Sequence, residues 1–298
     1  MSPALSGPLR DAIVVDWSAA AMPTTGTDSC WLALGALDVE GPIRTENHAT
    51  RFETMCAIEH HLSRSARRGR RVLVALDVSF GLPRGSAKVL GLPGRPRWRA
   101  LWRRVSELAV DDERNANNRF AVANELNESA KVRCFWGRPI APRFEQYRAL
   151  SVRNVAIDGL TESPLPRLRR TEELAGPGVI SNWMLVGKGA VGGQMLTCLP
   201  YLERLRNGEA EVRVWPFEGL GDPGGDVVLA ETWHGLFDWR AERDALRDQA
   251  QVRGTLRALR RAGTRGRVEL LTPRSLTSLP TRQRQGVLGE EGWTLGVR

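Results

Sequence analysis

Short apolar runs separated by polar turns dominate the first 80 residues of the chain. Runs such as "AIVVDW" and "VLVALDV" have the length and the β-branched content of buried strands. The segment 53–68 instead repeats its apolar positions at helical spacing, and Gly69 ends it. We therefore predict a helix over 53–68 and four strands, over 12–17, 30–37, 43–52 and 71–78.

After residue 78 the pattern loosens, and Gly, Pro and Arg become frequent. Periodic stretches beyond that point predict helices over 98–109, 117–129, 194–206 and 241–261, and strands over 180–186, 211–217, 226–233 and 267–271. No internal repeat and no long low-complexity linker divides the chain. This order of elements predicts one α/β domain over 1–298, with a large insertion at about 84–210.

The composition limits the class of protein. The chain has 298 residues, 42% of them hydrophobic, which is enough for a large core. No apolar run approaches the ~20 residues that span a bilayer, and the N-terminus lacks the apolar core of a signal peptide. The four cysteines lie far apart, which fits reduced thiols and not a disulfide framework or zinc knuckle. We therefore expect a cytoplasmic protein without a membrane partner, and we make no prediction of its oligomeric state.

The chain carries a net charge of +9, and arginine supplies nearly all of the positive charge. Such a balance suits a polyanionic partner, such as a nucleic acid or a nucleotide phosphate. A GC-rich genome would also favour arginine over lysine. That alternative explains the choice of arginine better than it explains the net excess.

Acidic residues occur where the pattern predicts a dry environment. Asp16, Asp77 and Glu231 each follow an apolar run, and Asp248 lies in the apolar stripe of the predicted helix 241–261. An ionised carboxylate removed from water costs several kcal/mol or more unless something pairs with it. Each residue alone is also typical of a turn or a helix cap. Together the four favour a cluster that binds divalent ions, either Mg²⁺ or Mn²⁺, which prefer oxygen ligands.

Several motifs in the chain resemble an uncharacterised bacterial family of predicted nucleases with a ribonuclease H-like fold. They are spread along most of the chain and are "VVDWSA", "ALDVSFGLP", "NANNRFAVANELN", "CFWGRP", "GKGAVGGQMLTCLPYLERL", "VWPFE", "LAETWHGLF", "RDQAQVR" and "EEGWTLGV". The resemblance implies a mixed five-stranded sheet, with three antiparallel strands followed by parallel ones and with flanking helices. It also implies that Asp16, Asp77, Glu231 and Asp248 are catalytic residues that bind two metal ions.

The chain departs from that family in two places. The segment "ETWHGLF", which begins at the third carboxylate, Glu231, has no proline where one is expected after that strand, and Arg247 precedes Asp248 where lysine is frequent. Some relatives are named for molybdopterin guanine dinucleotide synthesis, but nothing in this chain is typical of a pterin or nucleotidyl-transfer site. His234, three residues after Glu231, fits a structural role as well as it fits proton transfer.

A glycine-rich motif, "GKGAVG" at 187–192, favours a competing function. It follows the predicted strand 180–186, precedes a predicted helix and matches the dinucleotide-binding pattern, although no paired βαβ half is evident. It predicts an oxidoreductase that binds NAD(P). Two alternatives are a tight turn that allows close packing and a backbone nest in which Lys188 and Gly189 contact a substrate phosphate.

Two further segments contain candidate substrate-binding residues. In "RPRWRALWRR" at 95–104, Trp98 and Trp102 share a helix face among five arginines, as in surfaces that stack bases and pair with phosphates. The alternative is a surface helix that uses this tryptophan pair as core. In "NANNRF", Asn118 and Arg119 are either phosphate ligands or helix-capping residues.

Three hypotheses for function follow from these features. The first is a metal-dependent phosphodiester hydrolase, that is, a nuclease in which clustered carboxylates hold two divalent ions. The second is a non-catalytic protein that binds nucleotides or nucleic acid on the same fold. The third is the NAD(P)-binding oxidoreductase. The first requires that the predicted carboxylates lie within about one metal coordination shell of each other.

Overall fold

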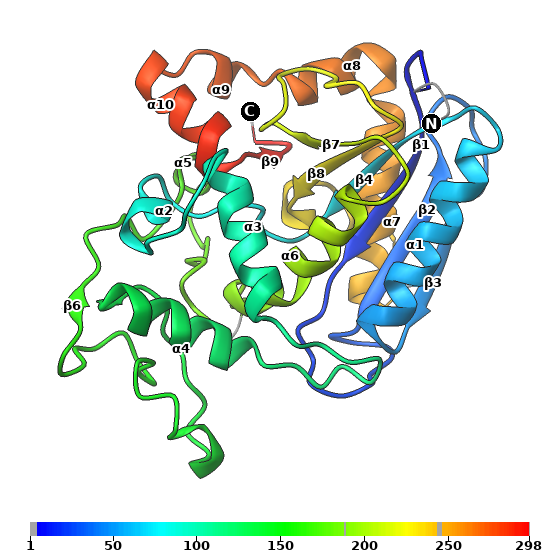
Figure 1. Ribbon diagram of the computed structural model, residues 1–298. Coiled ribbons are helices and arrows are strands. Elements are labelled where there is room, and N and C mark those ends of the chain that lie inside the picture. The colour runs from blue at the N-terminus through cyan, green and yellow to red at the C-terminus, as the bar shows by residue number, and fades with distance from the viewer. Residues whose placement is uncertain (1–4, 188, 243–245, 298) are drawn as a thin grey trace.

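The computed structural model of the protein describes residues 5–187, 189–242 and 246–297, and a mixed sheet lies at its centre (Figure 1). The strands lie in the order β3–β2–β1–β4–β8–β7, and β9 also pairs with β8. β1 and β3 each pair with β2 in antiparallel fashion. The other pairs of this sheet are parallel, and they are β1 with β4, β4 with β8, β8 with β7 and β8 with β9. The strands are β1 (Leu9–Asp16), β2 (Cys30–Ala36), β3 (Arg44–His48), β4 (Arg71–Leu76), β7 (Val212–Trp215), β8 (Val227–Thr232) and β9 (Thr294–Leu295).

This sheet confirms the predicted α/β class and the change from antiparallel to parallel pairing, but it has seven strands and not five. β7 pairs with β8 as far as Ala230, and β9 continues in the same position beside Glu231 and Thr232. β9 has two residues, which is too short for an alternating pattern to reveal. A separate pair, β5 (Val132–Arg133) and β6 (Thr161–Glu162), lies outside the main sheet.

Helices cover both faces of the sheet, and none among the described residues is long and apolar enough to cross a membrane. Side chains from α1, α3 and α6 pack with Ile13, Val15 and Val74 in one core, whereas α7 packs with Val14 and Ala75 in the other. The helices are α1 (Arg51–Ala66), α2 (Ser86–Val89), α3 (Arg97–Leu108), α4 (Arg119–Ala130), α5 (Arg170–Ala175), α6 (Gly192–Arg206), α7 (Arg247–Arg261), α8 (Gly263–Leu271), α9 (Arg274–Thr277) and α10 (Thr281–Gly286).

Two predicted strands are wrong. Residues 180–186 form no strand, and Met184 makes an isolated bridge to Trp136. Residues 267–271 belong to α8, where the buried Arg267 donates to carbonyls of Leu37 and Leu259. Both segments are short apolar runs, and periodicity alone does not distinguish strand from helix in such runs.

The predicted helix boundaries are also shifted, by one or two residues for α1, α3, α4 and α6 and by more at the start of α7. α1 begins at Arg51 because Thr50 caps it, with its side chain accepting the Glu53 N–H in a capping box. The predicted helix 241–261 begins at Arg247, and residues 243–245 lie outside the described residues.

The segment between β4 and β7 contains α2 to α6 and no strand of the main sheet. Within it, α3 and α6 pack against each other and contribute Leu101 and Leu199 to the same core as Val74 of β4. These helices therefore help to cover one face of the sheet. The predicted insertion at about 84–210 corresponds to this segment, and its status as part of one domain over 1–298 stays a prediction.

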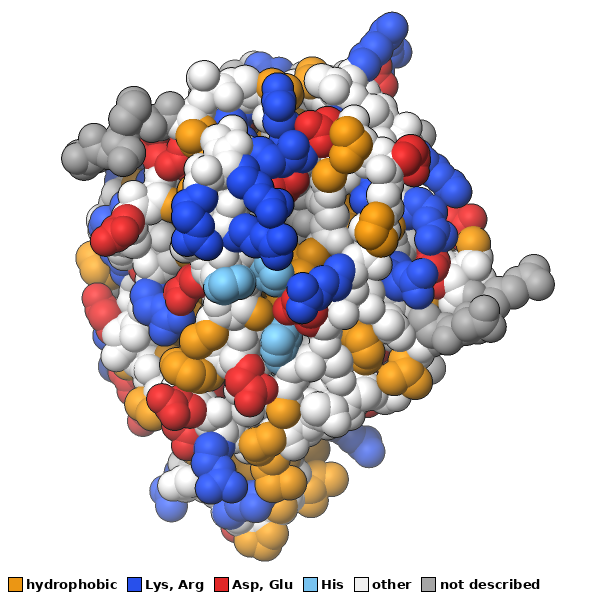
Figure 2. Space-filling view, turned by 90° about the vertical axis from the view of Figure 1, so that its right-hand side faces the viewer, with side chains coloured by type: hydrophobic (Ala, Val, Ile, Leu, Met, Phe, Trp, Pro, Cys, Tyr) orange, Lys and Arg blue, Asp and Glu red, His pale blue; other side chains and the backbone are white. Residues whose placement is uncertain are grey.

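Charged side chains protect the edge of the sheet at β3. Figure 2 shows Lys and Arg side chains gathered beside the histidines on the side of the molecule where α1 and β3 lie in Figure 1. The Glu46 carboxylate of β3 lies 3.0 Å from Arg44, 3.2 Å from His48 and 3.1 Å from His61. A charged edge strand resists pairing with a second chain.

Candidate metal centre

Asp16 and Asp77 lie side by side at the carboxyl end of the sheet. β1 and β4 are parallel neighbours, with Val15 opposite Leu76, so the next residue of each chain segment is an aspartate. The Asp77 N–H donates to the Val15 carbonyl at 3.0 Å, which holds the two segments together beyond the last paired residues. The predicted convergence of these two carboxylates is therefore confirmed, and it follows from strand adjacency.

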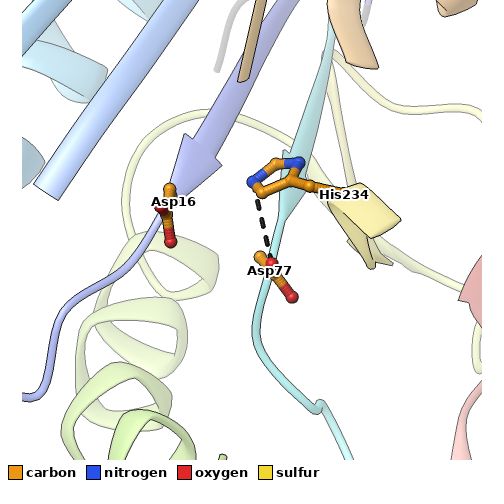
Figure 3. Close-up of side chains that lie close together, drawn as sticks. All are labelled: Asp16, Asp77 and His234. Atoms are coloured by element: carbon orange, nitrogen blue, oxygen red, sulfur yellow. Dashed lines mark ion pairs between the residues drawn. The ribbon is translucent and has the colours of Figure 1, made fainter. Parts of the chain in front are cut away.

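His234 completes the group from a third element. It begins the short 3-10 helix His234–Leu236, which follows β8 after one intervening residue. Its Nε2 lies 3.8 Å from Asp77 Oδ2, and one ligand atom from each of Asp16, Asp77 and His234 lies within 4.8 Å of the others. Figure 3 shows the imidazole and the two carboxylates directed towards one space. Two oxygens and one nitrogen at this spacing can hold a metal ion.

A contact with α7 fixes the orientation of the His234 ring. Its Nδ1 lies 2.9 Å from Thr255 Oγ1 of α7, while its Nε2 is buried without a hydrogen-bond partner among the described residues. Burial lowers the pKa of His234 to about 3, so the ring is neutral at physiological pH. With the proton on Nδ1 and donated to Thr255, Nε2 presents a free lone pair, as a metal-ligating histidine does.

The pKa values of the Asp16 and Asp77 carboxyl groups are both raised. Burial, followed by the charges of Asp77, Asp248 and Asp28, raises the pKa of Asp16 well above its ordinary value. Burial raises the pKa of Asp77 to about 7, with a further contribution from Glu231, and a hydrogen bond from the backbone of His234 opposes the rise. A divalent cation would remove both the repulsion and the need for these protons.

Asp248, the fourth predicted ligand, forms a hydrogen bond with the backbone of Asp28. It stands in the first turn of α7, and its Oδ2 accepts the backbone N–H of Asp28 at 2.7 Å. Its charge contributes to the raised pKa of Asp16. Among the described residues, the group with metal-ligand spacing contains Asp16, Asp77 and His234, and does not include Asp248.

The predicted role of Glu231 as a metal ligand needs correction. Its two carboxylate oxygens accept hydrogen bonds from Arg169 at 2.8 and 2.5 Å, and also from the Phe80 N–H at 3.0 Å and the Thr294 hydroxyl at 2.8 Å. Arg169 and Glu231 are both buried. Arg169 balances the charge of the carboxylate, and the four hydrogen bonds occupy its oxygens, so Glu231 forms a buried ion pair.

The tryptophans predicted to stack on bases lie in the core. Trp98 is 2% exposed and Trp102 is fully buried. Trp98 stacks on Phe217 with ring centroids 4.8 Å apart, and the Trp102 Nε1–H donates to the Phe80 carbonyl at 2.7 Å. These contacts leave neither ring a free face, which corrects the predicted role of Trp98 and Trp102 in substrate binding.

Asn118 supports the local backbone. Its Oδ1 accepts the Val110 N–H at 2.7 Å, and its Nδ2 donates to the Leu108 carbonyl at 2.8 Å. Asn118 is the N-cap residue of α4, but its side chain makes no capping hydrogen bond to that helix. Both polar ends of the side chain are instead occupied by the backbone that precedes it.

Arg119 remains a candidate for contact with an anion. It lies beside the start of α6, since a Cβ built on Gly193 would be 3.4 Å from Arg119 Cδ and Nε. Gln194, the next residue of α6, donates through its side chain to the carbonyl of Trp17 at 2.7 Å. Trp17 directly follows Asp16 in the sequence, so the start of α6 contacts the backbone next to Asp16. Burial lowers the pKa of Arg119 to about 10, at which it is still charged at physiological pH, and its Nε has no partner among the described residues.

The glycine-rich motif has a different context from the one a dinucleotide site requires. It precedes α6 but follows no strand, because residues 180–186 are irregular. Gly189 has a φ of +75° and helps the chain to turn before α6. Lys188 lies outside the described residues. The strand–turn–helix unit on which the oxidoreductase hypothesis depends is therefore missing from 180–192, apart from that residue.

Comparisons with known proteins add no relative. No protein-family model matches the chain, and no curated protein or solved structure matches it either. The case for a function therefore depends on the geometry described above.

Proposed function

We propose that the protein is a divalent-metal-dependent hydrolase that cleaves phosphodiester bonds. The observation that carries the proposal is the group formed by Asp16, Asp77 and His234, in which a buried imidazole nitrogen without a hydrogen-bond partner and two carboxylates are directed towards one space. A buried polar atom without a partner costs free energy, and a metal ion at this position would satisfy it.

The ligand set favours one type of ion over the other. Mg²⁺ strongly prefers oxygen, whereas Mn²⁺ also accepts imidazole nitrogen. Of the two predicted ions, Mn²⁺ therefore fits Asp16, Asp77 and His234 better. A single ion is proposed, because the Glu231 carboxylate is held by Arg169. When bound, such an ion would activate water and polarise a phosphoryl oxygen.

The residues of the chain would then have separate roles. Asp16 and Asp77, once deprotonated, hold the ion, and Thr255 fixes the orientation of the His234 ring through Nδ1. Arg119, at the start of α6, is the described candidate for holding a substrate phosphate near Asp16.

Two further features support a phosphate ester as the substrate class. The net charge of +9 suits a polyanion. The motifs that resemble predicted nucleases with a ribonuclease H-like fold include both aspartates, in "VVDWSA" and "ALDVSFGLP". The order of strands from β3 to β4 is compatible with that fold.

A metal titration combined with an activity panel tests the proposal. Wild type would be incubated with bis(4-nitrophenyl) phosphate and with labelled single- and double-stranded DNA and RNA, in Mn²⁺, Mg²⁺ or EDTA. We expect Mn²⁺-dependent hydrolysis that falls by orders of magnitude in Asp16→Asn and Asp77→Asn. Asp158→Asn is the matched control, because Asp158 is an exposed aspartate outside the group.

Two results would contradict the proposal. Hydrolysis that is equal in Asp16→Asn and Asp158→Asn would show that the activity does not come from this centre. Tight Mn²⁺ binding without hydrolysis of any substrate in the panel would favour the non-catalytic binding protein.

A further inference from the structure

A second hollow, apart from the candidate metal centre, is lined by arginine. It has a volume of about 550 Å³ and lies where α2, the start of α3 and α10 approach one another (Figure 1). Its charged and amide side chains are Arg84, Arg95, Arg97, Arg282, Gln285 and Glu290. No residue of the Asp16, Asp77 and His234 group lines it.

The positive charge of this hollow is poorly balanced. Four arginines line it together with one acidic residue, Glu290. Glu290 already accepts the backbone N–H of Gly85 at 2.9 Å and of Ala87 at 2.6 Å, and Arg97 reaches it at 3.5 Å. Among the described residues, neither Arg95 nor Arg282 has an ion pair to a carboxylate. Arg95 and Arg282 are exposed, so an anion that enters the hollow can reach them from solvent.

The backbone around the hollow holds one of these arginines in place. Arg84 packs directly over Gly286 of α10, where an added Cβ would lie 2.6 Å from Arg84 Cδ. The Arg84 N–H donates to Glu291 Oε1 at 3.1 Å, and its Nη1 donates to the Arg282 carbonyl at 3.2 Å. Arg84 is therefore positioned before any ligand arrives, which reduces the entropy lost on binding.

We propose that this hollow binds a small molecule that carries two or more phosphate groups. Its volume lies within the range of about 300–1,000 Å³ that is usual for small-molecule sites. Guanidinium groups bind phosphate oxygens in pairs, so four arginines suit more than one phosphate group. The other arginine-lined groove, beside α7, is a weaker candidate, because Arg253 and Arg257 there are paired with Glu242.

Calorimetry with inorganic pyrophosphate in EDTA and low salt tests this proposal without involving the metal centre. The key variant is Arg95→Ala/Arg282→Ala, which removes two charges from the hollow. The matched control is Arg261→Ala/Arg265→Ala, which removes two arginines elsewhere, one of them 95% exposed. We expect wild type and the control to bind pyrophosphate and the key variant to bind at least tenfold more weakly, with thermal melts showing that all three are folded.

Three further arms make the result decisive. Binding should weaken with added NaCl, adenosine without phosphate should not compete, and Asp16→Asn should bind pyrophosphate as wild type does. This last arm separates the two sites, since the hollow can bind pyrophosphate even if the metal centre fails its own test. Equal loss of affinity in both double variants, or no binding by wild type below about 1 mM, would overturn the proposal.

Discussion

Replacing Asp77 by asparagine should stabilise the metal-free protein at pH 8. The side chain keeps its size but loses the charge that burial disfavours at the end of β4. The folded-state pKa of Asp77, about 7, lies above the ordinary value of 3.8. The folded state therefore holds a proton that the unfolded state has released, and stability is lost as the pH rises from about 4 through 7. Above that range wild type carries the full penalty, and Asp77→Asn carries none.

The size of this effect follows from the same values. The difference between 3.8 and about 7 corresponds to about 4 kcal/mol at 25 °C. The Asp77 side chain keeps 27% of its surface exposed, and screening by solvent reduces the figure to about 2–3 kcal/mol. Asparagine also weakens the hydrogen bond from the His234 backbone, which offsets about 1 kcal/mol. We expect a net gain of about 1–2 kcal/mol at pH 8 and almost none at pH 4.

Urea denaturation in EDTA, followed at several pH values between 4 and 8, measures the difference. Asp158→Asn serves again as the control and should follow wild type throughout. Saturating Mn²⁺ at pH 8 should then stabilise wild type and leave Asp77→Asn almost unchanged, because the variant has lost an anionic ligand. An Asp77→Asn protein that is less stable than wild type at pH 8 in EDTA would refute the reasoning, since it would make Asp77 a structural partner and not a repelled ligand.

Three other substitutions separate the roles of neighbouring residues. Glu231→Gln should lower the free energy of unfolding by about 1–3 kcal/mol, because the buried Arg169 loses one charged partner and keeps its ion pair with Glu172, and calorimetry should show unchanged Mn²⁺ affinity. Thr255→Val should weaken Mn²⁺ binding by about 10–100-fold with little change in urea midpoint, because it removes the group that orients the His234 ring. Trp102→Ala should cost about 3–5 kcal/mol in urea denaturation and leave Mn²⁺ affinity intact in the folded fraction, as expected of a core residue.

The first half of the sheet and two of the metal ligands were predictable from local pattern. Strands β1, β2 and β4 each contain an apolar run, and Asp16 ends β1 while Asp77 directly follows β4. A carboxylate at the end of a buried strand is visible without knowledge of its neighbours. The adjacency of β1 and β4, which brings the two aspartates together, came from the family resemblance and not from spacing.

The remaining members of the centre depend on contacts between distant segments. Glu231 has the same apolar context as the two aspartates, and it differs because Arg169, from the irregular stretch before α5, reaches its carboxylate. No periodic pattern marks Arg169. His234 was less conspicuous than Glu231 in the sequence, because its lone pair becomes available only where the end of β8 and Thr255 of α7 meet.

The burial of Trp98 and Trp102 also depends on contacts that the sequence pattern does not reveal. Trp98 and Trp102 share one helix face as predicted, but amphipathic spacing does not say whether that face meets solvent or core. α6 and Phe217 cover it in the fold.

The most direct test of the metal centre is to detect the imidazole ligand on a bound ion. Wild type loaded with one equivalent of Mn²⁺ would be studied by electron spin-echo envelope modulation, which reports nitrogen nuclei bonded to the ion. The centre formed by Asp16, Asp77 and His234 predicts a ¹⁴N coupling in wild type that disappears in His234→Gln and persists in His48→Gln, whose histidine lies at β3. Mn²⁺ bound without a nitrogen coupling, or with one that survives in His234→Gln, would contradict it.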